Sequence, residues 1–466
     1  MRAQFALCAL ATGAGAASAA WQANVTADEA KEASCGDKCL EAVRRGSAEA
    51  LMFIGTNFDS DFYATASNMT GSRPGDVLKL QPVNPDQRQG IKAGTSIWRF
   101  QYTTVDLDGT LVPATGFVAF PYGAPPAGGK FRLVAYAHGT IGIFPRCVPS
   151  TVPNLFDYDT WQPLVSRGYA VVATDYAGLG NNATQHKYCS FNAHAADVYY
   201  SVVAARRLFG HVLTRKWMAA GHSQGGGAAW KLAESGLVAN DAAYLGTVAL
   251  APATYAVDMV LRGLDEGAEH SAFLPYLPLA VHRANASYHE TLLSDTMRRR
   301  VRLAETAQLC NSAVLALTDD LKGQRDQLVS LPGIERDMDT LLRWQDAEAP
   351  GQGSRSPAPV LVLQGLNDTT VLAPITMRAV ESSCGKGGNE VHLSLYPGLE
   401  HTPVVQAGAP EWLGWIDARF AAAAAAADKN GALPTGKGGK GGKGQKCSWR
   451  TREAFHMGHV SLPPGD

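Results

Sequence analysis

The chain has 466 residues, of which 46% are hydrophobic and 18% charged, and its formal net charge is -1. This length exceeds what one hydrophobic core usually fills, so we expect one large domain with an insertion or two closely packed domains. The near-neutral charge gives no reason to expect nucleic acid or an anionic membrane as a partner.

Residues 1–20 have the pattern of a secretory signal peptide. Arg2 precedes an apolar run that begins at Phe5, and small residues offer cleavage before Ala20 or Trp21. No later segment reaches the ~18 uncharged apolar residues of a membrane span. We therefore predict a secreted, extracellular protein without a transmembrane segment. Asn-x-Ser/Thr sites typical of a eukaryotic secretory route occur at Asn24, Asn68, Asn182 and Asn285.

Export makes the cysteines informative, because disulfides persist in oxidising compartments. Cys8 leaves with the signal peptide, and the odd number that remains allows at most three disulfides and one free thiol. We predict one pair, Cys384 with Cys447. No C-x-x-C or H-x-x-x-H spacing occurs, so we predict no metal site and no cofactor. The mature cysteines are Cys35, Cys39, Cys147, Cys189, Cys310, Cys384 and Cys447.

Residues 21–96 are polar and alanine-rich, and we interpret them as an N-terminal wrapping segment with a helix from Cys39 to Phe53. From Ile97 the pattern changes to strands. Asp108-Gly109 between two apolar runs predicts a hairpin. The apolar runs Phe131–Ala137 and Tyr169–Thr174 predict two buried strands. A helix follows them, and we expect Asn192 to cap it.

That motif is Gly221-His222-Ser223-Gln224-Gly225, which follows an apolar run and precedes small residues. The pattern predicts a strand, a tight turn and a helix. In such an elbow the nucleophile sits in a strained turn, so Gly221 and Gly225 are needed where strand and helix approach closely. Ser223 is therefore our candidate nucleophile.

We assign residues 97–254 to the first part of a hydrolase core and residues 358–430 to the second part. A crossover between their parallel strands needs only a dozen or more residues, so residues 255–357 form a helical lid or cap insertion. Its Phe273–Leu279 run is too apolar for an exposed loop and too rich in proline for a core helix, which suits a surface that lines an acyl site or meets a lipid interface. The arginines from Arg298 to Arg302 favour a solvated helix face, with acidic head groups as the alternative. Residues 431–466 are predicted to be a flexible Gly/Lys-rich tail.

A serine nucleophile needs a base, and the base needs an acid that fixes its tautomer. Asp368 follows a strand predicted at Pro359–Gly365, and His401 follows the last predicted strand, His392–Tyr396. We expect both residues at the edge of the sheet that holds the elbow. We predict a Ser223, Asp368, His401 triad. A glycan on Asn367 would crowd the acid, so we expect that site to stay bare.

Four other residues compete for these roles: Asp175, His222, His392 and Glu400. Asp175 precedes Ser223 in the chain and is interpreted as ordering a loop. His222 is expected to point away from the Ser223 hydroxyl, His392 to be structural, and Glu400 to crowd its neighbour His401.

The oxyanion hole requires two backbone donors. Gln224 N–H follows the nucleophile, and His138-Gly139-Thr140 is similar to an HG-type turn that supplies the second donor. We predict Thr140 N–H, with Gly139 in reserve and a supporting part for His138.

His138-Gly139-Thr140, Cys147-Val148-Pro149-Ser150, Thr174–Gly180, Gly221–Gly226, Gly365–Asp368 and Tyr396–His401 occur in a specific order and spacing. Together they resemble the secretory lipase family of α/β-hydrolases over about Ile97 to Phe420. The resemblance implies a mostly parallel sheet flanked by helices, a helical lid and hydrolysis of acylglycerols or other carboxylic esters. The N-terminal segment and the tail depart from it.

We therefore predict a secreted serine hydrolase that acts on ester or lipid substrates, most of all a triacylglycerol lipase that forms an acyl-enzyme and acts at a lipid-water interface. A plain carboxylesterase and a serine exopeptidase of the same fold are the alternatives. Too few residues precede Ile97 for the gating domain common in such peptidases. A non-enzymatic binding protein is disfavoured because all three triad residue types are present in order.

Overall fold

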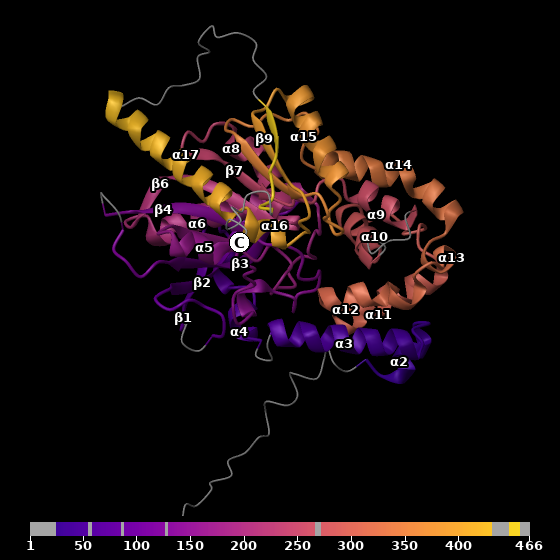
Figure 1. Cartoon of the computed structure of the whole chain (residues 1–466). Coiled ribbons are helices and arrows are strands. Elements are labelled where there is room, and N and C mark those ends of the chain that lie inside the picture. Colours follow the sequence, from indigo (N-terminus) through magenta and orange to yellow (C-terminus); the bar gives the residue numbers. More distant parts are fainter. Residues whose placement is uncertain are drawn as a thin grey trace, which may run out of the picture.

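A mostly parallel sheet forms the centre of the protein (Figure 1). The computed structural model describes residues 25–54, 58–84, 88–125, 129–265, 272–430 and 447–456. The predicted signal peptide and most of the predicted tail lie outside these residues. Within them the sheet has ten strands in the order β1-β2-β3-β5-β4-β6-β7-β8-β9-β10. The strands are β1 (Val77–Val83), β2 (Ser96–Val105), β3 (Leu111–Phe120), β4 (Phe131–Ala137), β5 (Ala170–Thr174), β6 (Leu213–His222), β7 (Tyr244–Leu250), β8 (Val360–Gly365), β9 (Val391–Tyr396) and β10 (Ser448–Thr451).

The strands differ in direction as their sequences suggest. β2 is antiparallel to both of its neighbours, β1 and β3, and β3 pairs antiparallel with β5. The predicted hairpin at Asp108-Gly109 is confirmed, since Asp106 N–H donates to Thr110 O between β2 and β3 at 2.9 Å. From β4 and β5 to β10 all pairs are parallel. β5, β7 and β8 are buried throughout, as parallel strands covered on both faces must be.

Helices cover both faces of the sheet, which confirms the predicted fold class. One buried cluster packs α5, α16 and α17 against one face, and a larger cluster packs α6, α7 and α15 against the other. These helices are α5 (Trp161–Ser166), α6 (Phe191–Phe209), α7 (Gln224–Ala233), α15 (Ala373–Gly387), α16 (Pro403–Ala407) and α17 (Ala409–Asn430), with α8 (Gly236–Ala239) after α7 and η3 (Pro149–Thr151) before α5. The prediction that Asn192 caps α6 is wrong: Ser190 is the N-cap, and Asn192 N–H donates to Glu348 Oε2 instead.

Between β7 and β8 a group of helices, which we call the cap, lies beside the sheet (Figure 1). It comprises α9 (Ala256–Asp265), α10 (Tyr276–Ala284), α11 (Asp295–Ala307), α12 (Asn311–Leu315), η5 (Ala316–Leu321), α13 (Arg325–Leu328) and α14 (Leu331–Glu348). The N-terminal segment adds α2 (Ala27–Glu32), α3 (Asp37–Ile54), α4 (Ser60–Tyr63) and η1 (Ser67–Met69). α3 lies along the cap and contacts α12 and η5 (Figure 1).

Two expectations about the cap are wrong in part. Arg299 and Arg302 are exposed, but Arg300 is buried, pairs with Asp320 at 2.6 Å and donates to the Ser34 carbonyl. In the Phe273–Leu279 run, Leu274 and Leu277 are buried in the cap and do not form a surface. The prolines permit this packing, since Pro275 is the N-cap of α10 and Pro278 lies in its first turn, where no N–H is needed.

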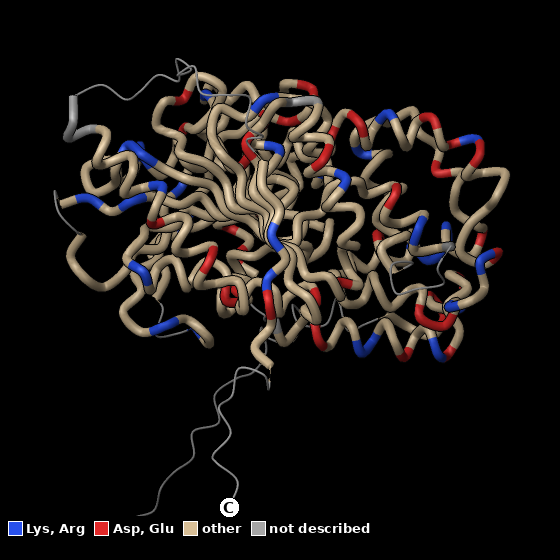
Figure 2. Tube along the Cα trace, turned by 45° about the horizontal axis from the view of Figure 1, so that its top comes forward, with Lys and Arg blue, Asp and Glu red and all other residues tan. Residues whose placement is uncertain are grey.

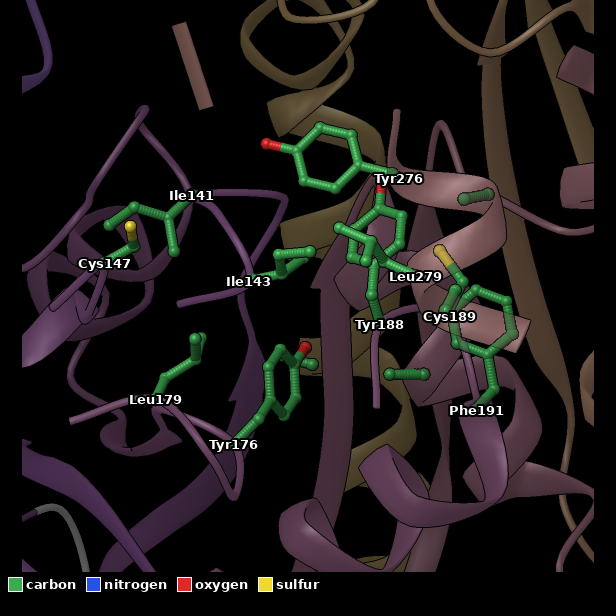
Figure 3. Packing of buried hydrophobic residues seen from close by; sticks show 14 of the residues in the cluster. Ile141, Ile143, Cys147, Tyr176, Leu179, Tyr188, Cys189, Phe191, Tyr276 and Leu279 are labelled. Carbon is green, nitrogen blue, oxygen red and sulfur yellow. The ribbon is translucent and has the colours of Figure 1, made fainter. Parts of the chain in front are cut away.

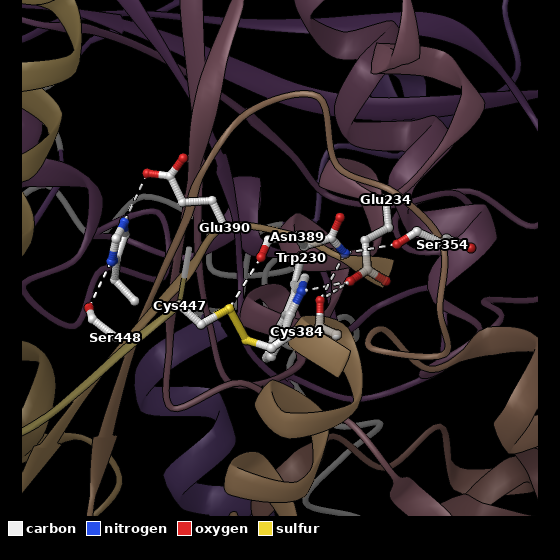
Figure 4. The surroundings of a disulfide bond; sticks show 10 residues. Trp230, Glu234, Ser354, Cys384, Asn389, Glu390, Cys447 and Ser448 are labelled. Atoms are coloured by element: carbon white, nitrogen blue, oxygen red, sulfur yellow. Dashed lines mark hydrogen bonds and ion pairs between the residues drawn. A yellow bond between two sulfur atoms is a disulfide. The ribbon is translucent and has the colours of Figure 1, made fainter. Parts of the chain in front are cut away.

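Three disulfides join the described residues: Cys35 to Cys39, Cys147 to Cys310, and Cys384 to Cys447. The last confirms the predicted pair and holds the chain beyond the Gly/Lys segment beside α15 (Figure 4). Cys189 is the free cysteine among them and is buried. The predicted flexible tail is corrected at Ser448–Thr451, because these residues form β10 and pair with β9 at the edge of the sheet.

Basic and acidic residues are interspersed along the outer helices and loops, and the central strands carry few of them (Figure 2). No helix in the described part of the chain is long and apolar enough to cross a membrane.

Candidate active site

Ser223 stands in the turn between β6 and α7. Its backbone has φ 60° and ψ -123°, a conformation that side-chain-bearing residues rarely adopt. Such strain at a single residue is typical of the elbow that lifts a nucleophile away from the sheet. Ser223 N–H donates to Leu250 O at 2.9 Å, and Ser223 O accepts from Ala253 N–H at 2.9 Å. The turn is therefore fixed to the end of β7 on both sides of the serine.

The two glycines of the motif are required by space. A Cβ on Gly221 would lie 2.1 Å from the Gly225 carbonyl oxygen, and a Cβ on Gly225 would lie 1.9 Å from the Ala137 carbonyl oxygen. Neither contact can be relieved by a side-chain rotation, because the obstructing atoms belong to the backbone. The predicted reason for Gly221 and Gly225 thus corresponds to the observed approach of β6, α7 and β4.

The structure brings Asp368 and His401 together. Asp368 follows β8, His401 follows β9, and His401 Nδ1 lies 2.8 Å from Asp368 Oδ2. The carboxylate is buried and accepts further hydrogen bonds from Gln364 Nε2 and from the backbone N–H groups of Thr370 and Val371. A carboxylate on Nδ1 fixes the imidazole tautomer that leaves Nε2 free to accept a proton.

His401 Nε2 makes no hydrogen bond to Ser223 in this structure. His401 Nε2 is buried and has no hydrogen-bond partner among the described residues, although His401 and Ser223 line the same cavity. In hydrolases this bond often tightens only when substrate is bound. The arrangement therefore provides a base with an unengaged nitrogen beside a hydroxyl.

The predicted oxyanion donors are also unengaged. Gln224 is the first residue of α7, so its N–H has no acceptor within the helix, and it lies at the positive end of the helix dipole. Neither Gln224 N–H nor Thr140 N–H donates a hydrogen bond within the described residues. Gly139 and Thr140 line the cavity with Ser223. Thr140 is therefore the candidate donor that lines the cavity, and Gln224 adjoins it as the residue after Ser223.

Asp175 and His138 support the loop that carries Thr140. Asp175 accepts from Ser150 N–H, Ser150 Oγ and Thr115 Oγ1, and its own carbonyl lies 3.3 Å from His138 Nε2. Burial raises the pKa of Asp175 to about 6 and lowers the pKa of His138 to about 4. Both predictions, a loop-ordering Asp175 and a supporting His138, agree with these contacts.

Sequence reasoning gave His222 no role, yet it contacts the candidate base. Its ring lies 4.6 Å from the His401 ring, and its Nε2 lies 3.3 Å from the His401 carbonyl oxygen. Burial lowers the pKa of His222 to about 3, so the ring is neutral and can donate to that carbonyl. The other competitors stay apart: His392 bonds Ser448 and Glu390, and Glu400 is exposed.

The cavity above Ser223 has a volume of about 450 Å³ and two walls. The core wall consists of Gly139, Thr140, Phe156, Tyr158, His222, Ser223, Thr369, Thr370, His401 and Thr402. The cap wall consists of Ala272, Phe273, Asn311, Leu315, Asp319 and Lys322. Of the predicted Phe273–Leu279 run, only Phe273 reaches this cavity. Asp319 and Lys322 form an ion pair at 3.3 Å. Sequence reasoning missed Asn311, Leu315, Asp319 and Lys322, because no local pattern marks which cap residues face the core.

Comparisons with known proteins identify the family and the fold. A family model described as secretory lipase matches residues 150–428, more than half of the chain. Lipase A of Candida antarctica in its closed state has a similar fold, with a TM-score of 0.62 at 18% identity over 78% of this chain and 86% of that one. The rice cell wall degrading esterase LipA of Xanthomonas oryzae gives 0.58 at 18% identity over 77% and 98%. A putative hydrolase of Legionella pneumophila gives 0.59 at 16% identity over 77% and 99%. No curated protein matches the sequence.

Proposed function

The chain belongs to the secretory lipase family of ester hydrolases, and on that premise we propose that it acts through a serine nucleophile, Ser223, with His401 as base and Asp368 as acid. The observation that carries this proposal is the convergence of a strained serine at φ 60° with a histidine held at 2.8 Å by a buried carboxylate. The predicted resemblance to the family is confirmed, and the roles of the individual residues are proposed.

In the proposed reaction Ser223 Oγ attacks the carbonyl carbon of the ester while His401 Nε2 takes the hydroxyl proton. The oxyanion that forms accepts hydrogen bonds from Gln224 N–H and Thr140 N–H. Collapse of this intermediate breaks the bond to the alcohol, which receives the proton from His401. A water molecule then attacks the acyl-enzyme in the same way, so the acid leaves and Ser223 regains its proton.

We propose acylglycerols as the substrate class, with triacylglycerol as the first candidate. Phe156, Tyr158, Phe273 and Leu315 give the cavity an apolar lining suited to an acyl chain. Its volume of about 450 Å³ lies in the lower part of the roughly 300–1,000 Å³ range of ligand pockets, so short and medium chains fit best. The Asp319–Lys322 pair in the wall favours the second candidate, a carboxylesterase for small polar esters.

An active-site label tests the mechanism. A fluorophosphonate reacts with an activated serine, so digestion and mass spectrometry should find one adduct, on the peptide that contains Ser223. Hydrolysis of triacylglycerol emulsions, short soluble esters and aminoacyl amides should then be measured side by side. Activity on emulsions supports the lipase, and activity on soluble esters alone supports the carboxylesterase. A label elsewhere, with hydrolysis intact, overturns the assignment of Ser223.

We also propose that the protein is secreted. Three disulfides suit an oxidising compartment, and the family description agrees with export. Expression with the native leader in a eukaryotic host should place the protein in the medium with an N-terminus at Ala20 or Trp21. Retention inside the cell with residues 1–20 still attached would contradict the predicted signal peptide.

A further inference from the structure

Thr140 is tied to the cap through a tyrosine. Its Oγ1 shares a hydrogen bond of 3.0 Å with the Tyr188 hydroxyl, and Tyr188 lies just before α6. The Tyr188 ring stacks on that of Tyr276, the first residue of α10, with centroids 4.8 Å apart and planes at 29°. Figure 3 shows the two rings side by side, with Ile141 and Ile143 of the core loop nearby. The loop that carries Thr140 is thus connected to the cap through the side chains of Tyr188 and Tyr276.

The path continues through the cap and returns to the same loop. Tyr276 OH donates to Asn311 Oδ1 at 2.9 Å, and Asn311 N–H donates to the Ile141 carbonyl oxygen at 2.9 Å. Ile141 is the neighbour of Thr140, so the contacts close into a ring, which we call the cap ring: Thr140, Tyr188, Tyr276, Asn311 and Ile141. Tyr188, Tyr276 and Ile141 are buried.

Two further links fasten this loop to the cap. The Cys147–Cys310 disulfide joins the end of the loop to the residue before Asn311. Arg283 Nη1 donates to the Ile143 carbonyl oxygen at 2.8 Å. Raising α12 from the core would therefore be restrained by a covalent bond and would leave buried hydroxyl groups without partners, which is unfavourable.

From these contacts we propose that the cap ring positions the Thr140 N–H, so that the cap is a structural part of the oxyanion hole and not a lid that opens from its α12 side. The inference rests on the proposed function, since it needs Thr140 to be an oxyanion donor. Asn311 also lines the cavity, whereas Tyr188 and Tyr276 are positioning residues, because they act on the reacting oxygen only through Thr140. They set kcat and leave substrate affinity nearly unchanged.

The test removes one hydroxyl at a time and preserves the stacked rings. Tyr188→Phe breaks the bond to Thr140, and Tyr276→Phe breaks the bond to Asn311. Tyr288→Phe is the matched control, because Tyr288 is a buried cap tyrosine outside the ring. For each variant, kcat and KM on a soluble ester, the melting temperature and the affinity for an alkylboronic acid should be measured. The boronic acid forms a tetrahedral adduct with the serine and therefore reports on the oxyanion site.

We expect kcat to fall about tenfold in Tyr188→Phe and in Tyr276→Phe with KM within twofold, less than the 10²–10³ of deleting a donor because the donor is displaced and not removed. Boronate affinity should fall by the same factor, and the double variant should lose little more than either single one. The control should keep its kcat.

Two results would overturn the cap ring: unchanged kcat in both ring variants, or equal losses in the Tyr288→Phe control. A rise in KM alone would assign these residues to substrate binding and would also reject it. Measuring Ser223→Ala in parallel separates the two proposals. If that variant retains activity, the proposed function fails; if it is inactive while the ring variants match the parent, only the cap ring fails.

Discussion

The two walls of the cavity are built by different physical means. The core wall depends on close backbone approach: Ser223 has a positive φ, and Gly225 leaves no space for a Cβ. The cap wall depends on side-chain packing: Leu315 lies on α12, which a disulfide and α3 hold in place, and Phe273 lies just before α10. A backbone constraint appears in the sequence as a motif of a few consecutive residues. Packing between helices that are distant in the sequence produces no such motif. The core wall should therefore fail abruptly on substitution, and the cap wall should change gradually.

The largest effect is expected at the candidate triad. Ser223→Ala and His401→Ala should each reduce kcat for ester hydrolysis by about 10⁴-fold or more, because residues that act as a unit lose their effect together. The double variant should be no worse than either single one. Steady-state kinetics on a soluble ester tests this, and circular dichroism shows that the fold is intact. Activity within tenfold of the parent in either variant would remove that residue from the mechanism.

The next effect tests the backbone constraint itself. Gly225→Ala places a Cβ 1.9 Å from the Ala137 carbonyl oxygen, so β4 and α7 must separate. We expect a loss of about 3 kcal/mol in the free energy of unfolding, the upper part of the range for overpacking, together with loss of activity.

Gly414→Ala is the matched control for this experiment. Gly414 lies in α17, where a Cβ meets nothing within 4 Å. The control should gain up to about 1 kcal/mol from helix propensity. Urea denaturation compares the two variants. Equal stability of Gly225→Ala and the parent would show that the elbow tolerates a side chain.

The same contrast explains what could be predicted from the sequence. The strands of the parallel core, the elbow and the pairing of Asp368 with His401 follow from local patterns and from the rule that parallel strands end at one edge of the sheet. Asn311 could not be found, because Cys147 and Cys310 are 163 residues apart and disulfide connectivity cannot be read from spacing. Leu277 was misjudged because two prolines suggested a broken helix, although both stand where α10 begins.

The cap wall should respond to substitution by a change in substrate preference. Phe273 lines the cavity, so Phe273→Ala enlarges it and should shift the ratio of kcat/KM for long over short acyl chains by about tenfold. Its neighbour Leu274 is buried in the cap and does not line the cavity. Leu274→Ala should therefore lower stability by about 2–5 kcal/mol and leave the preference unchanged. Esters of increasing chain length test both variants, and an unchanged preference in Phe273→Ala would place acyl binding elsewhere.

The smallest effect lies beneath the core wall, at the buried carboxyl of Asp197 on α6. Burial raises its pKa to about 7, although Asp197 Oδ2 accepts a hydrogen bond from Ala177 N–H. The unfolded chain ionises near pH 4 and the folded chain near pH 7, so between these values the unfolded state is favoured progressively as pH rises. Stability from this group is therefore present below about pH 4 and is lost as pH rises through 7.

Asp197→Asn keeps the acceptor for Ala177 N–H and removes the titration. The difference between the melting temperatures of Asp197→Asn and the parent should change by about 3 °C between pH 4 and pH 8. The change favours the variant as pH rises. Buried histidines such as His194, whose pKa burial lowers to about 3, destabilise the fold in acid, but they are present in both proteins and cancel in the difference. Calorimetry at pH 4, 5, 6, 7 and 8 gives this difference directly. If this difference does not change with pH, or if it moves in favour of the parent as pH rises, Asp197 is ionised in the folded core. In that case α6 carries no buried proton at this position.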